Sequence, residues 1–444
     1  MKTETLLHYA TLAVPRYTSY PTAADFVAVT DEQRADWLGK IKPDQAVSLY
    51  IHVPYCRQLC YYCGCHAKAT KKDDAIVGYA ESVIKDIRLQ AQHLKGKPRG
   101  VHLHWGGGTP SILPRQSFLS IMETLHEFFE FDKKAEHAIE LDPRTVTHDL
   151  VKTLLEIGVN RTSLGVQDVN PQVQKAIGRI QPAAIVKRSV DYLREAGLEH
   201  INFDLIYGLP LQTIETLNDT CRTIGEYHPN RIACYGYAHL PKRRANQRLI
   251  DAALLPGPLE RFYQAAAVEK NLVDMGYIPI GIDHFALPDD HLAIAAKEHH
   301  LHRNFQGYTD DDCPVLIGFG CSSISEFRDG FAQTVAGIAE YRRTIDANKM
   351  ATVRGIATND DDRLRASMIA KLMCDFKLDL SKFGGKAKFQ SALEHLKPII
   401  ADGLATEHDG IIDMTEEGRP FVRAVASLFD AYRQQNMAQF SAAV

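Results

Sequence analysis

The sequence has no apolar run that approaches the ~18 residues needed to span a bilayer. Its first ten residues carry Glu4 and His8 where a signal peptide would have an apolar core. It also lacks an excess of one charge, because 51 basic and 55 acidic residues leave a formal net charge of -4. Nucleic-acid-binding domains are usually clearly basic. We therefore expect a cytoplasmic protein with neither a membrane nor a nucleic acid as partner.

Cysteine is too scarce for a disulfide scaffold, with nine in 444 residues, and the absence of a fixed-period repeat argues against a solenoid. Four of the nine nevertheless fall in one short stretch, at Cys56, Cys60, Cys63 and Cys65. In a reducing compartment such a cluster indicates metal or redox chemistry.

Short β-branched or aromatic runs alternate with amphipathic stretches of helical length. The predicted strands are 47–53, 101–105, 137–141, 161–166, 201–207 and 231–237. The predicted helices are 75–94, 116–129, 148–157, 182–196, 214–227 and 259–275. About six strand-helix units in a row predict an α/β protein with a parallel sheet. Because the residues capable of chemistry follow the strands, as at the active face of a barrel, we expect a partial or full TIM-like barrel.

The two ends of the chain differ from this central pattern. Residues 1–40 contain Pro15 and Pro21 around a polar, aromatic run and are predicted to form an irregular, extended arm. From about residue 338 the pattern becomes mostly helical, and 399–404, 409–414 and 421–432 read as helix, hairpin and helix, which resembles a winged-helix unit. This stretch has no basic stripe, so a structural or lid role is favoured over DNA binding. The predicted domains are 1–40, 41–337 and 338–444.

The four clustered cysteines directly follow the first predicted strand. A structural zinc site usually joins two separated pairs of cysteines, whereas four thiols on one loop can wrap a compact polynuclear cluster. An iron-sulfur cluster is therefore favoured, with zinc and incidental free thiols as the alternatives. If three thiolates bind a four-iron cluster, one iron keeps an open position for a ligand.

Polar residues and a glycine run stand at the ends of other predicted strands. The run GGGTP (106–110) lacks both the phosphate-loop and the dinucleotide fingerprints, and it is either a flexible turn or a place where backbone approaches a ligand. Glu140, Gln167, Arg179 and Asp204 are each alone typical of caps or ion pairs. Together on one face they can hold ribose hydroxyls, an adenine edge and a carboxylate.

The spacing Cys56-x3-Cys60-x2-Cys63, with an aromatic Tyr62 before the last cysteine, resembles the radical S-adenosylmethionine (SAM) superfamily. The resemblance implies that these three cysteines bind a 4Fe-4S cluster and that Cys65 does not. It further implies that the open iron chelates the methionine part of SAM, that one electron cleaves the sulfonium to a 5'-deoxyadenosyl radical, and that the glycine run holds the methionine amino group.

Longer strings narrow the resemblance: PRYTSYPT (15–22), LYIHVPYCRQLCYYCGC (49–65), HWGGGTP (104–110), DLIYGLP (204–210) and HRNFQGY (302–308). They look like the oxygen-independent coproporphyrinogen III oxidase family, whose partial (β/α)6 barrel holds two SAM molecules. By this resemblance the cluster-bound SAM is surrounded by Tyr50, Gly107, Glu140 and Ile324. The second SAM is surrounded by Tyr62, Gly108, Thr109, Gln167, Arg179, Asp204 and Ala238. Tyr50 and Glu140 are also the candidate catalytic residues.

The resemblance implies the oxidative decarboxylation of two propionates of coproporphyrinogen III to vinyl groups, giving protoporphyrinogen IX. The resemblance also implies an electron donor such as flavodoxin or ferredoxin, an unidentified electron acceptor and a monomeric state. Because the substrate is anionic, local cations are needed, and Arg16 is the first candidate. Tyr17 and Tyr20 are candidates to cover the macrocycle. Further candidate cations are Lys242, Arg243, Arg244 and Arg303.

Two other functions remain open at this point. One is a related radical SAM enzyme that opens or methylates finished haem. The other is a haem-binding chaperone that does no decarboxylation. The PRYTSYP arm and the HRNFQGY string favour the oxidase.

Overall fold

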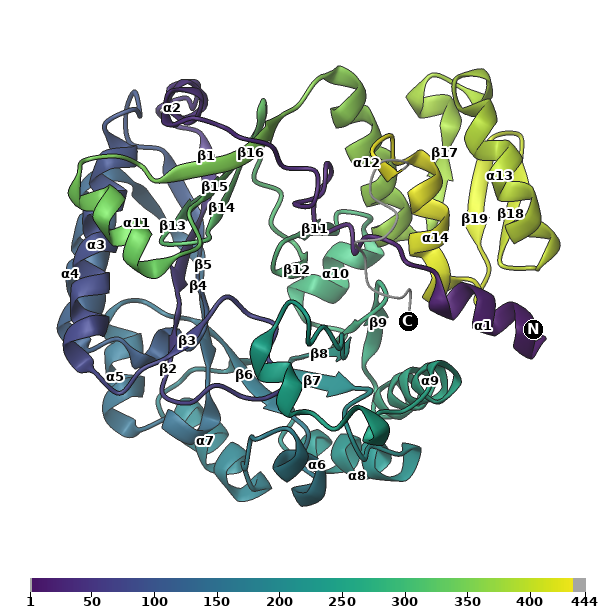
Figure 1. The fold of residues 1–444 in the computed structure, drawn as a ribbon, viewed down its shortest axis with the longest axis horizontal. Coiled ribbons are helices and arrows are strands. Elements are labelled where there is room, and N and C mark those ends of the chain that lie inside the picture. The colour runs from purple at the N-terminus through teal and green to yellow at the C-terminus, as the bar shows by residue number, and fades with distance from the viewer. Residues whose placement is uncertain (1, 434–444) are drawn as a thin grey trace.

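A twelve-stranded sheet dominates the computed structural model, which describes residues 2–433 (Figure 1). Six of its strands lie side by side in chain order and pair in parallel. They are β1 (Ala46–Val53), β4 (Arg99–Gly107), β5 (Glu130–Leu141), β6 (Arg161–Gln167), β7 (His200–Tyr207) and β8 (Arg231–Gly236). The predicted α/β class and partial (β/α)6 barrel are confirmed.

Additional strands extend the sheet at both edges. Beside β1, β13 (Leu316–Phe319) pairs in parallel, and β14 (Ile324–Phe327), β15 (Gly330–Thr334) and β16 (Thr352–Ala357) follow in antiparallel pairing. At the other edge β10 (His284–Ala286) and β9 (Ile278–Ile280) continue antiparallel from β8. The sequence pattern did not predict these extensions. The sheet curls without closing, since β16 and β9 end the strand order.

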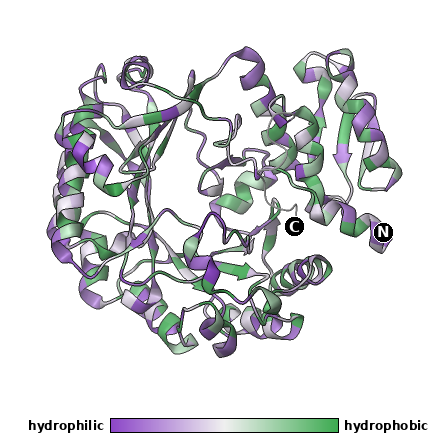
Figure 2. Ribbon diagram, viewed as in Figure 1, coloured by the Kyte–Doolittle hydropathy of each residue, from purple (hydrophilic) through white to green (hydrophobic). Residues whose placement is uncertain are grey.

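Helices cover the outer face of the parallel strands (Figure 1). They are α3 (Asp73–Ala91), α4 (Arg115–Phe128), α5 (His148–Glu156), α6 (Pro171–Ala176), α7 (Ala183–Glu195), α8 (Ile214–Gly225) and α9 (Pro258–Asp274). In α8 the hydroxyl of Thr213 caps the first turn, and Leu217, Cys221 and Ile224 form a buried stripe at helical spacing. In Figure 2 the outer helices alternate hydrophilic and hydrophobic colour, as amphipathic helices do.

The prediction that residues 1–40 are irregular throughout is wrong at two places. Residues Thr3–Thr11 form α1, and Asp31–Leu38 form α2. The second helix begins with a reciprocal capping box between Thr30 and Gln33. The first has no side-chain cap and buries Leu6 and Tyr9 in the C-terminal core, so tertiary packing stabilises it. Residues 12–30 between the helices have no helix or strand.

The C-terminal part is mostly helical, as predicted. It contains α11 (Ile338–Asp346), α12 (Asp360–Asp375), β17 (Lys377–Asp379), α13 (Gln390–Ala401), β18 (Ala405–His408), β19 (Ile411–Met414) and α14 (Val422–Ala426). The predicted helix over 421–432 is shorter, because α14 has 3-10 turns on both sides. The domain boundary at 338 stays a prediction, and β16 beyond it still belongs to the barrel sheet.

The remaining elements are short. They are β2 (Tyr55–Cys56), β3 (Lys68–Ala69), α10 (His291–Lys297), β11 (His302–Asn304) and β12 (Gly307–Thr309). Among residues 2–433, no helix combines the length and the apolarity that a membrane crossing requires.

Candidate functional site

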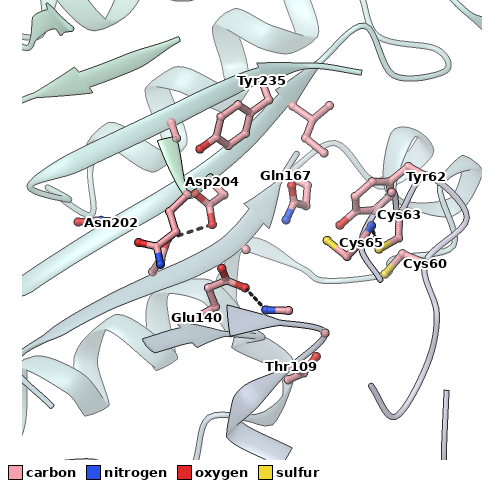
Figure 3. A pocket seen from close by; sticks show the side chains of 18 of the residues that line it. Cys60, Tyr62, Cys63, Cys65, Thr109, Glu140, Gln167, Asn202, Asp204 and Tyr235 are labelled. Atoms are coloured by element: carbon pink, nitrogen blue, oxygen red, sulfur yellow. Dashed lines mark hydrogen bonds between the residues drawn. The ribbon is translucent and has the colours of Figure 1, made fainter. Parts of the chain in front are cut away.

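A cavity of about 870 Å³ occupies the interior of the partial barrel and opens at the cysteine loop (Figure 3). Most predicted site residues line it: Arg16, Cys56, Cys60, Tyr62, Cys63, Gly107, Gly108, Thr109, Glu140, Gln167, Arg179, Asp204 and Ala238. Cys65 lines it too. Of the further candidate cations, Arg244 lines it as well. The predicted residues outside this lining are Tyr17, Tyr20, Tyr50, Ile324, Lys242, Arg243 and Arg303. Side chains spread over some 220 residues of sequence therefore meet at one cavity, as the strand-end argument predicted.

The cysteine loop is held in place by a segment far along the chain. The side-chain amide of Asn246 donates to three carbonyl oxygens of the loop, at 3.1, 3.1 and 2.9 Å, namely those of Cys60, Tyr61 and Cys63. The amide of the neighbouring Gln247 donates to the carbonyl of Tyr62 at 2.8 Å. The two side-chain amides thus bond to carbonyl oxygens of the loop and not to its thiols.

The spacing of the thiols bears on which metal group they can hold. A tetrahedral zinc with bonds of ~2.3 Å keeps its sulfur atoms about 3.8 Å apart. Within residues 2–433, the only group of three or more potential ligand atoms within 4.8 Å of one another is Asp311, Asp312 and Cys313. No three thiols of the loop therefore lie within 4.8 Å of one another, and three soft thiolate ligands on one loop are the donors that a polynuclear iron-sulfur cluster takes.

Polar groups surround the three predicted ligand thiols. The hydroxyl of Thr109 donates to the Cys56 sulfur at 3.3 Å, and the Arg179 guanidinium donates to the Cys60 sulfur at 3.5 Å. Burial raises the pKa of the Cys56 thiol to about 11. The exposed Cys65 donates its backbone N–H to the Cys63 sulfur at 3.4 Å, which places Cys65 beside a predicted ligand.

A buried carboxylate orients the arginine at Cys60. Asp142 follows β5 and pairs with Arg144 at 2.6 Å and with Arg179 at 3.3 Å. Arg179 also donates to the carbonyl of Gly165 at 2.7 Å. Because two arginines share one carboxylate, the Cys60 side of the cavity has an excess of positive charge. Such an excess suits a negatively charged cluster or a substrate carboxylate.

The glycine run is a place of close backbone approach. Gly108 donates its N–H to the carbonyl of Val53 at 2.8 Å, and a Cβ added to Gly108 would lie 2.7 Å from the carbonyl oxygen of Tyr55. Gly107 has a φ of 114°, and a Cβ there would meet the His52 ring at 2.7 Å. A side chain at Gly107 would press on the His52 ring of β1, and one at Gly108 would press on the Tyr55 backbone at the start of the cysteine loop.

The predicted catalytic pair lies together next to this run. Glu140 accepts from the N–H of Gly107 at 3.2 Å, and its other oxygen lies 3.3 Å from Nε2 of His104. A Cβ on Gly106 would contact both the Glu140 carboxylate, at 2.8 Å, and the Tyr50 hydroxyl, at 3.0 Å. Tyr50 therefore adjoins Glu140, although it does not line the cavity itself.

A neutral histidine fixes the hydroxyl of Tyr50. Burial lowers the pKa of His52 to about 4, so its ring carries a single proton at neutral pH. Its Nε2 lies 3.0 Å from the carbonyl oxygen of His66 and must donate there. Its Nδ1 then accepts from the Tyr50 hydroxyl at 3.0 Å. This bond orients the Tyr50 hydroxyl beside Glu140.

Asp204 faces the cavity opposite the cysteines (Figure 3). It accepts from the hydroxyl of Ser163 at 2.9 Å. Burial and then the nearby charge of Glu140 raise the pKa of Asp204 to about 7. Gln167, at the end of β6, has a φ of 67°. This left-handed conformation is uncommon outside glycine and is often found at functional positions.

The three predicted substrate contacts of the arm divide into two groups. Arg16 is exposed, lines the cavity and donates to the carbonyl of Gly236 at 3.4 Å. Tyr17 and Tyr20 instead pack into the C-terminal core, where they are 4% and 5% exposed. Neither tyrosine lines the cavity, and the prediction that they cover a macrocycle stays a prediction.

Several site residues were missed from the sequence. Asp142 and Arg144 form an Asp-Pro-Arg string directly after a predicted strand, a signal that strand-end reasoning could have used. His104, inside a predicted strand, also lines the cavity beside Glu140. Asn246 and Gln247 carry no local signal, because their partners lie more than 180 residues earlier in the chain.

Comparisons with known proteins agree with this geometry. Residues 50–224 match the radical SAM superfamily, and residues 359–421 match the HemN C-terminal domain. The chain is 42% identical over 439 residues to a protein from Bradyrhizobium diazoefficiens named oxygen-independent coproporphyrinogen III oxidase, with 97% of each chain covered. It is 38% identical to the Escherichia coli protein of the same name, covering 96% of this chain and 95% of the other.

A solved structure described as the coproporphyrinogen III oxidase HemN of Escherichia coli, a radical SAM enzyme, superposes with a TM-score of 0.89 at 37% identity. The superposition covers 94% of this chain and 97% of that chain. The similarity therefore extends over the barrel and the C-terminal part together.

Proposed function

Since the chain belongs to the oxygen-independent coproporphyrinogen III oxidase family of radical SAM proteins, we propose that it decarboxylates two propionates of coproporphyrinogen III to vinyl groups. The product is protoporphyrinogen IX, which places the enzyme in haem synthesis. The observation that carries the proposal is the cavity that joins the three predicted ligand cysteines to Glu140, Asp204 and Arg16.

Cys56, Cys60 and Cys63 fit the role of cluster ligands by number and by chemistry, and all three line the cavity. When bound, the 4Fe-4S cluster and SAM together supply a 5'-deoxyadenosyl radical that removes hydrogen from a substrate propionate. The residues of this chain bind and orient the reactants. The amides of Asn246 and Gln247 hold the loop so that the three thiols present one face to the cavity.

Glu140 provides an acceptor for the SAM molecule nearest the cluster, and Tyr50 adjoins Glu140 outside the cavity lining. The Glu140 carboxylate is held by the Gly107 N–H at 3.2 Å, which leaves lone pairs for a ligand amine or hydroxyl. The Tyr50 oxygen is oriented through His52. These roles follow the family resemblance, and the hydrogen-bond geometry supports them.

A second SAM molecule is proposed for the other wall of the cavity. Gln167, Asp204 and Arg179 offer an amide, a carboxylate with its pKa near 7 and a guanidinium, which together match adenine, ribose and a methionine carboxylate. A small electron-transfer protein such as flavodoxin or ferredoxin is the proposed reductant. The chain is proposed to act as a monomer in the cytoplasm.

Anaerobic reconstitution with iron and sulfide, followed by mass spectrometry of the tetrapyrrole, tests the proposal. With coproporphyrinogen III, SAM and a reductant we expect protoporphyrinogen IX and 5'-deoxyadenosine. A protein that holds zinc, or that leaves coproporphyrinogen III unchanged while cleaving SAM, would refute the assignment.

A further inference from the structure

Two short segments beside the cysteine loop carry basic residues and no acidic ones. Residues 57–72 contain Arg57, Lys68, Lys71 and Lys72, and residues 242–248 contain Lys242, Arg243, Arg244 and Arg248. Neither segment contains an aspartate or a glutamate, although the whole chain has more acidic than basic residues. The positive charge at this place is therefore a local feature that the net charge of the chain does not explain.

Both segments are hydrogen-bonded to the backbone of the predicted cluster ligands. The first segment contains β3, which pairs with β2, and the N–H of Thr70 donates to the carbonyl of Cys56 at 2.9 Å. The second segment contains Asn246, whose side-chain amide donates to the carbonyl of Cys63 at 2.9 Å. The two basic segments therefore flank the loop, one at its first predicted ligand and the other at its last.

Most of these basic side chains point to solvent and not into the cavity. Only Arg244 lines the cavity, and the other seven basic residues of the two segments are exposed. Arg57 forms an ion pair with Asp73 at 2.6 Å. Within residues 2–433, the ammonium groups of Lys71, Lys72 and Lys242 form no ion pair. These charges can therefore meet a partner that approaches from outside, but they cannot reach a ligand held inside the barrel.

The outer side of the cysteine loop is open between the two segments. Gln58 and Gly64 are exposed, and a Cβ added to Gly64 would meet no other atom within 4 Å. A second protein can therefore come up to the loop without displacing a described segment of this chain. Positive charge around such an opening speeds the encounter with a negatively charged partner and helps to orient it.

We propose that residues 57–72 and 242–248 form the docking surface for the reductant, a small acidic electron-transfer protein. The docked protein gives one electron to the cluster and is itself oxidised by one electron. This inference rests on the proposed function, since it takes a cluster in the loop as the electron acceptor. An electron-transfer protein is favoured over a nucleic acid because the basic segments are bonded directly to the predicted redox site. Lys242 and Arg243 then serve the protein partner and not a substrate carboxylate.

The first test measures association and needs no turnover. An acidic flavodoxin is titrated into the full-length reconstituted protein by isothermal titration calorimetry, without SAM or tetrapyrrole. Lys71→Gln/Lys72→Gln removes two charges from the first segment, and Lys242→Gln removes one from the second. Lys133→Gln/Lys134→Gln is the matched control, because these adjacent lysines are also exposed. They stand near the start of β5, at the end of the parallel strands opposite to the cysteine loop.

At low salt we expect the lysine pair variant of the first segment to bind flavodoxin about fivefold more weakly and Lys242→Gln about twofold, the losses typical of two exposed ion pairs and of one. The control should bind as the wild type does. At ~1 M salt all four proteins should bind alike, because exposed charges are then screened. Unchanged affinity in both surface variants would overturn the docking surface, as would an equal loss in the control. A loss that persists at high salt would also overturn it, since that indicates a structural role.

The second test compares two reductants in the formation of 5'-deoxyadenosine. With dithionite, a small molecule that needs no docking surface, the lysine pair variant of the first segment should match the wild type. With reduced flavodoxin below saturation it should be slower. A wild-type protein that cleaves SAM with dithionite but binds no flavodoxin would refute the docking surface alone. A wild-type protein that forms no 5'-deoxyadenosine with dithionite would refute the proposed function, and this inference with it. Binding of a DNA duplex that the variants lose, with flavodoxin binding unchanged, would assign the surface to nucleic acid instead.

Discussion

Replacing Asn246 by alanine tests whether a distant side chain keeps the cysteine loop in its ligand-binding form. Asn246 has two amide protons and faces three loop carbonyls at 3.1, 3.1 and 2.9 Å, so at most two bonds form at full strength. At roughly 0.5–1.5 kcal/mol for each bond, the variant loses about 1–3 kcal/mol of loop stability. Opening of the loop then becomes about 5–150 times more frequent, since each ~1.4 kcal/mol is a factor of ten.

The assay is the rate at which a strong iron chelator removes iron from the reconstituted protein under anaerobic conditions. Because the chelator reaches iron through the opened loop, the rate should rise by the same factor in Asn246→Ala. Asn271→Ala is the matched control, since the amide of Asn271 also makes two bonds, at 2.8 and 2.7 Å, but within the helix layer of α8 and α9.

The control should lower the global free energy of unfolding while leaving iron release slow. Iron release at the wild-type rate in Asn246→Ala would show that these bonds do not hold the loop. Equal acceleration in both variants would show that iron escapes through global unfolding, and either result refutes the reasoning.

Three further predictions concern the ligands, the arm and a titrating carboxylate. Serine at any one of the three predicted cluster ligands should abolish the iron-sulfur absorption, whereas Cys65→Ser should retain it. The ultraviolet-visible spectrum after reconstitution measures this absorption in each variant. Arg16→Ala should slow formation of the vinyl product and leave SAM cleavage measurable, because Arg16 lies at the cavity wall formed by Gly236; loss of cleavage would move Arg16 out of the substrate role. The pKa of Asp204 is about 7 in the folded state, well above its unfolded value of ~3.9, so ionisation on raising the pH through 7 destabilises the fold. Between pH 6 and pH 8 the wild type should therefore lose about 1.4 kcal/mol of unfolding free energy relative to Asp204→Asn in urea titrations; parallel pH profiles would contradict the raised pKa.

Five of the six parallel strands were predicted to within two residues at each end because their burial is dictated by local pattern, whereas β5 (Glu130–Leu141) begins seven residues before the predicted 137–141. β7 runs over His200–Tyr207 with a near-alternating pattern of burial, and the expected strand was 201–207. The helices between strands carry apolar stripes, as in α8, that identify them without knowledge of their neighbours. In contrast, α1 has no side-chain cap and depends on burial of Leu6 and Tyr9 against the C-terminal domain, which a local pattern cannot show.

The candidate site shows the same contrast between residues that a local pattern predicts and residues that only the tertiary structure brings together. Cys56, Gly107, Glu140 and Asp204 stand on or directly after strands, so the parallel topology alone predicts that they meet. The residues that position them come from elsewhere in the chain: the bonds of Asn246 to the loop span more than 180 residues. No spacing rule relates such positions, since their proximity is a consequence of how the whole barrel curls.

The PRYTSYPT segment shows how one motif serves two purposes. Arg16 reaches the carbonyl of Gly236 at the cavity, while the next residue, Tyr17, is buried with its hydroxyl donating to Asp430 at 2.9 Å. Tyr17 has a φ of 49°, an uncommon left-handed conformation that turns the chain between these two contacts. The Tyr20 hydroxyl accepts from the N–H of Ala431 at 2.9 Å. The tyrosines thus anchor the arm to the C-terminal domain, and this anchoring fixes where Arg16 stands in the cavity wall.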